Sequence, residues 1–454
     1  MQPVKYVDIR FLDQSHVQQT ILIRGRITFA RFFKNFGFIR LRYQNSTLQV
    51  VVTEDVVGAD QFNALQKLYT ESIIECTGTL KLADKKVRST TYHDFEMDML
   101  SYTIVSASNI IPFQIDVTET GKKINVYNDT KMDNRFLDLR SSTNNAIFKI
   151  QSHALTYFRM FLLENGFTEI HTPKILGAAS ESGSAVFKVP YFDKKGFLAQ
   201  SPQLHKQMAI NADFDKVFTI GPVFRAEKSV TSRHLCEFIG LDLEMTITPG
   251  QTYRMIQEFI WKLLTFIFDN LQSNCSADME RVAETYPFEK ISYPSEPLII
   301  KFSDCVAMLK EQGIEQGDLE DLSTINEAML AVAVKVKYGS DLFIVDQYPE
   351  SVRPFYTMQS EDTNYSNSFD VIFRCTEISS GAQRINDHAT LMKRISDKGI
   401  DATTLTDYTN SFLYGSMPHG GCGFGLERIV SLFLNLGNVK LASLCPRDPN
   451  RIFP

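Results

Sequence analysis

The spacing of apolar residues changes character along the chain. From residue 20 to about residue 112, short runs alternate apolar and polar positions with a period of two. Turn residues, Asn45-Ser46 among them, separate these runs, and one helix-like stretch at residues 60–69 interrupts them. Five short strands with one interposed helix predict a small closed barrel at the N-terminal end of the chain.

Beyond the barrel, helical and strand patterns are mixed. Apolar residues at helical spacing predict long helices over residues 144–163 and about 252–271, and Asn165-Gly166 is typical of a left-handed cap that ends the first one. The predicted strands cover residues 167–176, 216–224, 238–245, 342–349, 353–358 and 368–375. Strands and helices do not alternate regularly, and no G-x-x-x-x-G-K-[ST] loop is present. The fold class is therefore α+β, with a mostly antiparallel sheet and flanking helices behind an all-β barrel.

Composition narrows the choice of compartment and class. The 454 residues, 44% of them hydrophobic, are enough for two or three domains with sizeable cores. Seven cysteines without a C-x-x-C pair suit a reducing compartment and argue against a disulfide framework or a structural zinc site. The N-terminus has charges where a signal peptide needs an apolar core, and no apolar run is long enough for a membrane span. We expect neither secretion nor membrane insertion.

The net charge of −6 by itself argues weakly against nucleic acid as a partner, but the charge is unevenly spread. Residues 1–110 carry 13 Lys and Arg against 11 Asp and Glu, a net of +2, which leaves −8 for the remainder. The predicted barrel is of the OB type, which binds single-stranded nucleic acid by stacking bases on aromatic rings beside a positive groove. Arg24, Arg26, Arg31 and Lys34 are candidates for that groove and Phe38 for the ring. The alternative is an ordinary exposed barrel face with Phe38 in the core.

Charged and polar side chains are concentrated between residues 200 and 245. Two predicted strands, 216–224 and 238–245, form a hairpin, and Arg225, Glu227, Arg233 and His234 fall at or beside the strand ends. The planar guanidinium of arginine matches two phosphate oxygens, so this hairpin is a candidate phosphate clamp. The alternative is a solvated charged hairpin.

A second candidate is the glycine-rich stretch 418–433, PHGGCGFGLERIVSLF. Its glycines allow close backbone approach to a ligand, and they run directly into an apolar helix whose first turn bears Glu427 and Arg428.

Taken together, these segments resemble the class II aminoacyl-tRNA synthetases of the aspartate, asparagine and lysine subgroup. F-R-A-E followed by R-H resembles motif 2 (about 217–245), G-L-E-R resembles motif 3 (about 418–433), and the helix, strand and proline over about 152–173 resemble motif 1. Q-S-P-Q-L-H-K at 200–206 is similar to the aspartyl-tRNA synthetases in particular, of the eukaryotic cytosolic or archaeal type. The resemblance implies an OB-fold anticodon-binding domain at 1–110, a linker at 111–140 and a class II catalytic domain at 141–454.

The resemblance also implies roles for individual residues. Arg225 and Arg428 are the expected catalytic residues, and Glu377 and Ser380 the expected Mg²⁺ ligands. The expected aspartate-binding residues are Glu181, Gln203, Lys206, Arg225, Asp242, Ser380 and Arg384, with His419 as a further candidate. The expected ATP-binding residues are Arg225, Glu227, Arg233, His234, Leu235, Phe238, Glu377, Gly425, Leu426, Glu427 and Arg428. The expected anticodon contacts are Phe38, Gln49 and Glu96.

The implied activity is that of a cytoplasmic, homodimeric ligase that activates L-aspartate with ATP and transfers the aspartyl group to tRNA(Asp), with no DNA or membrane partner. Lys206 and Arg384 favour aspartate over asparagine because two cations at one site leave a neutral amide poorly matched. Three alternatives remain open: an asparaginyl-tRNA synthetase, an ammonia-using asparagine synthetase and a non-catalytic tRNA-binding paralogue. Ser182, Cys422 and Cys445 depart from the family pattern, and none of the three removes an expected substrate ligand.

Overall fold

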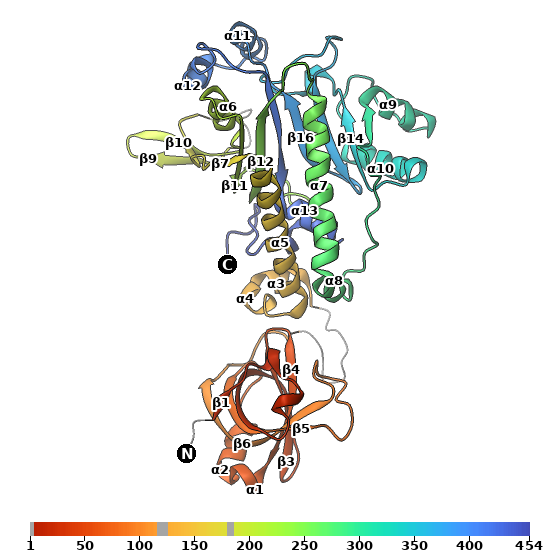
Figure 1. Cartoon of the computed structure of the whole chain (residues 1–454). Helices are drawn as coiled ribbons and strands as arrows, with labels where there is room; N and C mark the ends of the chain where they lie inside the picture. The colour runs from red at the N-terminus through yellow and green to blue at the C-terminus, as the bar shows by residue number, and fades with distance from the viewer. Residues whose placement is uncertain (1–3, 116–125, 179–185) are drawn as a thin grey trace. The chain divides into compact units, whose positions relative to one another are not determined.

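The computed structural model describes residues 4–115, 126–178 and 186–454 (Figure 1). The chain forms two compact units, Met1–Asn145 together with Pro454, and Ala146–Phe453. Each unit has its own sheet and its own core.

The first unit is built around the predicted barrel. Five strands form antiparallel pairs except for the parallel β4–β6 pair, and the pairing of β2 with β5 closes the barrel. The strands are β2 (Thr20–Phe32), β3 (Phe36–Tyr43), β4 (Ser46–Thr53), β5 (Ile73–Leu82) and β6 (Phe95–Ser106), with a short β1 (Lys5–Tyr6) beside β2. The interposed helical piece is α1 (Glu54–Val57) and α2 (Ala59–Gln66). The prediction of a closed five-stranded barrel is confirmed.

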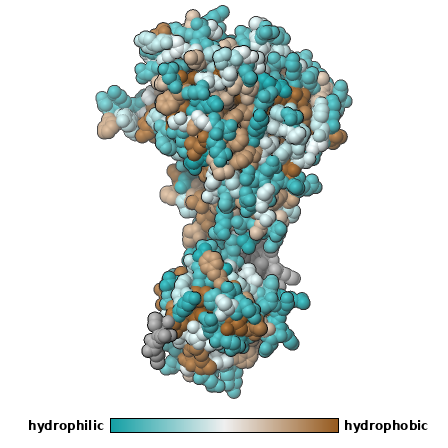
Figure 2. All heavy atoms as spheres, viewed as in Figure 1, coloured by the Kyte–Doolittle hydropathy of each residue, from teal (hydrophilic) through white to brown (hydrophobic). Residues whose placement is uncertain are grey.

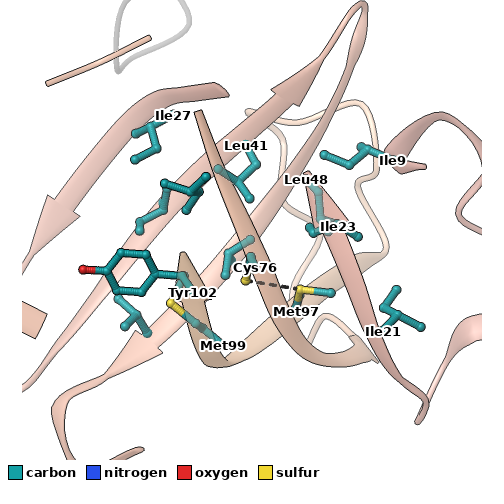
Figure 3. Packing of buried hydrophobic residues seen from close by; sticks show 14 of the residues in the cluster. Ile9, Ile21, Ile23, Ile27, Leu41, Leu48, Cys76, Met97, Met99 and Tyr102 are labelled. Carbon is teal, nitrogen blue, oxygen red and sulfur yellow. Dashed lines mark hydrogen bonds between the residues drawn. The ribbon is translucent and has the colours of Figure 1, made fainter. Parts of the chain in front are cut away.

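The barrel interior is filled by the inward-pointing residues of every strand (Figure 3). Cys76 lies among them, completely buried, with its Sγ 3.7 Å from the Sδ of Met97. Burial raises the pKa of the Cys76 thiol to about 12. This thiol therefore stays protonated and serves as a packing group.

The described part of the segment 111–140 is helical near its end and belongs to the first unit. It contains α3 (Asn128–Asp133) and α4 (Arg135–Asp138). The carboxylate of Glu71 is buried and accepts from Arg42 at 3.0 Å and from Arg140 at 2.9 Å. This shared ion pair ties residues after α4 to the barrel.

The second unit contains an eight-stranded sheet in the order β13-β14-β15-β16-β17-β12-β11-β7. All neighbours are antiparallel except β13–β14 and β11–β7, so the predicted mostly antiparallel sheet is confirmed. The strands are β7 (Thr168–Glu169), β11 (Lys216–Phe224), β12 (Glu237–Thr246), β13 (Ile299–Lys301), β14 (Leu342–Asp346), β15 (Ser368–Phe373), β16 (Thr376–Gln383) and β17 (His419–Gly425). A small separate sheet contains β8 (Ile175–Leu176), β9 (Lys188–Tyr191) and β10 (Lys194–Leu198).

Helices flank this sheet (Figure 1). The two long helices predicted from periodicity are present as α5 (Ser142–Glu164) and α7 (Arg254–Asn274), and Gly166 after α5 has the positive φ of +80° expected of its cap. The others are α6 (Gln203–Asn211), α8 (Ser276–Ala283), α9 (Phe302–Glu311), α10 (Thr324–Tyr338), α11 (His388–Asp397), α12 (Thr406–Asn410) and α13 (Leu426–Phe433).

Two of the predicted strands are wrong in extent. Residues 167–176 form only the two-residue strands β7 and β8, which pair in different sheets. Residues 353–358 form no strand and make only the isolated bridge of Thr357 with Arg384. Pro173 and Pro354 lie in these segments, and proline has no N–H to donate to a continuous ladder.

The surface seen in Figure 2 is mainly hydrophilic, with scattered hydrophobic residues. Among the helices of the described residues, none is both long enough and apolar enough to span a membrane.

Candidate active site

One row of residues crosses the middle of the large sheet. The register pairs Asp242 on β12 with Gly423 on β17, Gly423 with Ser380 on β16, and Ser380 with Asp370 on β15. A side chain added at Gly423 would lie 2.7 Å from the Oδ1 of Asp242. The bare backbone of Gly423 leaves room for the carboxylate of Asp242 on the neighbouring strand, and the approach of a ligand to this glycine-rich strand stays a prediction.

A cavity of about 1130 Å³ opens over this row. Most of the residues predicted from the resemblance line it. They are Gln203, Arg225, Glu227, Arg233, His234, Leu235, Phe238, Asp242, Glu377, Ser380, Arg384, Gly425, Glu427 and Arg428. Within the described ranges, the cavity wall does not include Lys206, His419 or Leu426, whose side chains are buried. Glu181, predicted to bind aspartate, and Ser182 lie outside the described residues.

Two cations, Lys206 behind the cavity wall and Arg384 in it, converge on one buried carboxylate. Lys206 is 1% exposed, and its Nζ lies 3.1 Å from the Oδ1 of Asp242 and 3.3 Å from the Oε2 of Glu244. Arg384 is 4% exposed and donates from Nε to the Oε1 of Glu244 at 2.9 Å. Burial raises the pKa of Glu244, but the charges of Arg384 and Lys206 outweigh burial, so this pKa lies below its ordinary value.

Glu244 is not among the site residues predicted from the sequence. Strand alternation does indicate it, since Glu244 follows Asp242 by two positions in β12 and therefore lies on the same face of the strand. The two carboxylates balance the charges of Lys206 and Arg384. An incoming carboxylate therefore has to compete with Glu244 for the same two cations.

A chain of side-chain hydrogen bonds links α6 to His419 on β17. Gln203 donates to the Oε1 of Gln207 at 2.9 Å, and the Nε2 of Gln207 lies 3.1 Å from the Nε2 of His419. The Nδ1 of His419 lies 2.7 Å from the carbonyl oxygen of Met417, which can only accept. His419 therefore carries its proton on Nδ1 and accepts from Gln207. Burial lowers the pKa of His419, which keeps its ring neutral.

At the other end of the cavity, arginines collect around the ends of β11 and α13. The guanidinium of Arg225 lies 5.7 Å from the ring centroid of Phe238, in cation–π contact. Arg428 donates to the carbonyl of Glu377 at 3.1 Å and reaches the carbonyl of Arg233 at 3.5 Å. Burial, and after it the like charges of Arg233 and Arg225, lower the pKa of Arg428, although the charge of Glu377 opposes this. A polyanion would relieve that repulsion, so this end of the cavity suits a polyphosphate.

The loop between β11 and β12 and the start of α13 line the same end of the cavity. The ring of His234 is held by Thr231, whose Oγ1 lies 2.7 Å from Nδ1, and burial lowers the pKa of His234. The carboxylate of Glu427 accepts from the backbone N–H of Ile239 at 3.0 Å. Burial raises the pKa of Glu427 to about 7. Glu427 therefore fixes the start of α13 to β12.

The expected metal ligands lie beside a further carboxylate. Burial, and after it the charge of Asp370, raise the pKa of Glu377 to about 7. Arg353 donates to the Oγ of Ser380 at 2.9 Å and pairs with Asp370 at 2.8 Å. Crowded carboxylates with a hydroxyl oxygen are hard donors that suit Mg²⁺. Among the described residues, no three His, Cys, Asp or Glu side chains form a ready-made metal cage.

On the barrel, the three predicted anticodon residues share one face. The register pairs Gln49 on β4 with Glu96 on β6, and Gln49 donates to the Oε2 of Glu96 at 3.0 Å. Phe38 on β3 pairs with Val51, two positions along β4 from Gln49. Because alternate residues of a strand face the same side, Phe38 and Gln49 point the same way.

Cys422, which departs from the family pattern in the glycine-rich strand, does not narrow the cavity. Its side chain is completely buried, and it alternates with Gly421 and Gly423, so it lies on the opposite face of β17. Burial raises its pKa to about 12.

Comparison with known proteins agrees with this fold and site. The model of the family "tRNA synthetases class II (D, K and N)" matches residues 127–449. A relative from Arabidopsis thaliana, named aspartate–tRNA ligase 1, cytoplasmic, is 42% identical over 98% of this chain and 86% of its own length. The fold and the cavity define a class II synthetase, and the chain belongs to the class II tRNA synthetases of the D, K and N group.

Solved structures of class II synthetases have the same fold as this chain. The aspartyl-tRNA synthetase from Entamoeba histolytica superposes with a TM-score of 0.89 at 40% identity, covering 100% of this chain and 93% of the other. The asparaginyl-tRNA synthetase from Pyrococcus horikoshii, in complex with asparaginyl-adenylate, gives 0.87 at 26% identity, covering 99% and 100%. Identity is therefore higher to the aspartyl enzyme of this pair.

Proposed function

We propose that the chain is an aspartate–tRNA ligase. It activates L-aspartate with ATP to aspartyl-adenylate, releases pyrophosphate, and transfers the aspartyl group to the 3′-terminal adenosine of tRNA(Asp). The observation that carries this proposal is the match over nearly the whole chain to relatives named aspartate–tRNA ligase, together with the convergence of Lys206 and Arg384 on Glu244 beside the cavity.

In the first step, an oxygen of the aspartate α-carboxylate bonds to the α-phosphorus of ATP. The bond from that phosphorus to its bridging oxygen breaks, and pyrophosphate leaves with the electron pair. Arg225 holds the α-phosphate against the attacking carboxylate, and Phe238 stacks on the adenine that Glu227 recognises. Arg233, His234 and Arg428 hold the outer phosphates. Catalysis here is positioning and charge stabilisation, with no covalent enzyme intermediate.

Aspartate lies at the opposite end of the cavity in this proposal. Its ammonium pairs with Asp242, and its side-chain carboxylate takes hydrogen bonds from Lys206 and Arg384 in exchange for those of Glu244. Gln203 contacts the substrate from α6. The neutral His419 and Gln207 support this pocket through their hydrogen bonds.

Mg²⁺ is the expected cofactor, held by Glu377 and Ser380 with Asp370 close by, and when bound it neutralises phosphate charge. The crowding of Glu377 and Asp370 supports this assignment because a divalent cation would stabilise both as carboxylates.

In the second step, the terminal ribose hydroxyl of tRNA(Asp) takes the acyl group and AMP leaves. The barrel reads the anticodon through Phe38, Gln49 and Glu96. We further propose a homodimer in the cytoplasm. The exposed apolar side chains Met160 and Leu163 on the motif 1 helix α5 support the dimer, and the names of the relatives support the compartment.

The alternative specificity for asparagine is less well supported, because the asparaginyl-tRNA synthetase from Pyrococcus horikoshii is less similar in sequence to this chain than the aspartyl enzyme from Entamoeba histolytica. A non-catalytic paralogue is disfavoured by the presence of Arg225, Arg384 and Arg428 at the cavity.

The test is amino-acid-dependent exchange of pyrophosphate into ATP, measured with aspartate and asparagine side by side. The proposal predicts exchange with aspartate alone. Exchange with asparagine would overturn the substrate assignment, and no exchange with either amino acid would overturn the proposed activity. Aminoacylation of tRNA(Asp) with labelled aspartate, without ammonia, separates a ligase from an asparagine synthetase.

A further inference from the structure

The β2–β3 hairpin ends in an exposed aromatic cluster that none of the roles above uses. Phe33 and Phe36 close the hairpin, joined by a hydrogen bond from the N–H of Phe33 to the carbonyl of Phe36 at 2.7 Å. Each side chain is 41% exposed. Phe32, between them and the barrel, instead points inward and contacts Phe62 at 5.5 Å between ring centroids. The outward pair is therefore not required by the barrel core.

The two exposed rings are already arranged as a stack. Their centroids lie 4.7 Å apart with an interplanar angle of 17°. The guanidinium of Arg31 lies 5.3 Å from the ring centroid of Phe33, in cation–π contact. Both rings meet Phe38 nearly at right angles, at 6.4 Å and 5.8 Å. The cluster is thus continuous with the ring that the resemblance assigns to the anticodon.

The hairpin tip is also held in place. The N–H of Glu54, at the start of α1, donates to the carbonyl of Asn35 at 2.9 Å. Fixed rings lose little side-chain entropy when a partner binds, which is the advantage of a preorganised surface. An aromatic ring offers a stacking surface to any nucleobase, and Arg31 and Lys34 beside it supply positive charge for the phosphates.

We propose that Phe33 and Phe36 form a second stacking platform, which binds an unpaired base of the tRNA anticodon loop next to the base bound at Phe38. This inference rests on the proposed assignment of the barrel face to the anticodon. The occupant is an RNA base rather than an apolar protein segment because cations flank the rings and because Phe36, Phe38 and Arg31 lie on one face with Gln49 and Glu96.

The main test compares the variants Phe33→Ala, Phe36→Ala and the double variant with the wild type in aminoacylation of tRNA(Asp). Loss of stacking on one base weakens tRNA binding by about 5- to 100-fold. The matched control is Phe11→Ala, because Phe11 is also an exposed phenylalanine of the first unit, 67% exposed, with the Arg10 guanidinium 5.1 Å from its ring centroid. We expect a rise of at least about fivefold in KM for tRNA in the double variant, and no change in Phe11→Ala.

Two further variants separate stacking from simple hydrophobic contact. Phe36→Trp keeps a planar ring and should retain wild-type KM for tRNA, whereas Phe36→Leu keeps apolar area without a ring and should behave like Phe36→Ala. A 2-aminopurine base placed in the loop of an anticodon stem-loop RNA reports directly, through its fluorescence, whether that base stacks on the protein. Its fluorescence should be quenched by the wild type and less so by the double variant, with unchanged thermal melting of the protein.

The outcomes distinguish this inference from the proposed function. Unchanged KM and quenching in the double variant, with a clear defect in Phe38→Ala, would overturn the second platform and leave the proposed function standing. Aspartate-dependent exchange with no tRNA defect in any of these variants, Phe38→Ala included, would overturn the barrel assignment and the platform with it. Equal defects in Phe36→Leu and Phe36→Trp would overturn stacking as the cause.

Discussion

Under the proposed function, the cavity of the second unit and the outer face of the barrel bind their ligands by opposite means. At the cavity wall and directly behind it, Arg384, Lys206 and Glu244 are almost entirely buried, and each charge is matched by another. On the barrel, Phe33 and Phe36 are half exposed, with the guanidinium of Arg31 over the ring of Phe33, and Gln49 and Glu96 lie further along the same face. A small charged ligand needs fixed charges in a dry site, whereas an unpaired base needs a flat ring that it can reach. The two regions should therefore respond differently to substitution.

The largest expected effect is on the phosphate end of the cavity. Arg225→Ala should reduce aspartate-dependent exchange by about 10³-fold or more, because a guanidinium on the reacting phosphate stabilises charge that develops only in the transition state. Binding of tRNA(Asp), measured by filter binding, should stay within about twofold of the wild type, since the barrel carries that contact. Retained exchange would refute Arg225 as the phosphate clamp.

The next effect contrasts a buried with an exposed ion pair. Glu244→Ala leaves Lys206 and Arg384 with one counter-charge fewer and should lower the free energy of unfolding by about 3 to 5 kcal/mol. Its control is Glu75→Ala on the barrel, where Glu75 pairs with the half-exposed Arg24 and should cost about 0 to 1 kcal/mol. Urea denaturation measures both. Equal losses in the two variants would contradict the difference between the regions.

A smaller effect depends on pH. The pKa of Glu427 is raised by burial from 4.5 to about 7, so the folded state binds a proton that the unfolded state has already released above pH 4.5. Stability from this group is therefore fully present below pH 4.5 and declines as pH rises to about 7. Glu427→Gln removes the decline, so the variant should gain up to about 3 kcal/mol relative to the wild type between pH 4.5 and 7.5. Urea denaturation at several pH values checks this, and a difference that does not change with pH would contradict it.

The smallest effect concerns polar contacts on the barrel. Glu96→Gln keeps the shape of the side chain but changes its charge and its hydrogen bond with Gln49. Loss of a polar base contact at the weak end of the usual range, about 1 kcal/mol, should raise KM for tRNA(Asp) by about fivefold while exchange with aspartate is unchanged. A parallel loss in exchange would show that the barrel face also affects activation.

The same contrast explains what the sequence could predict. Barrel strands and long helices follow from local periodicity, and β2, α5 and α7 begin within two residues of the predicted positions. Strand alternation places Glu244 on the same face as Asp242, but its pairing with Lys206 and Arg384 was not predicted, because these partners come from α6 and from the residue after β16 and no local pattern encodes that contact. Periodicity likewise does not say which face of a barrel strand is exposed, so the outward stack of Phe33 and Phe36 was not predicted.

The central claim is that activation and tRNA selection reside in separate regions of the molecule. The most direct test measures aspartate-dependent exchange and tRNA(Asp) aminoacylation on the same preparation of Phe38→Ala. The account predicts exchange within about twofold of the wild type and a fall of about 5- to 100-fold in kcat/KM for tRNA. A fall of equal size in both activities would contradict this separation.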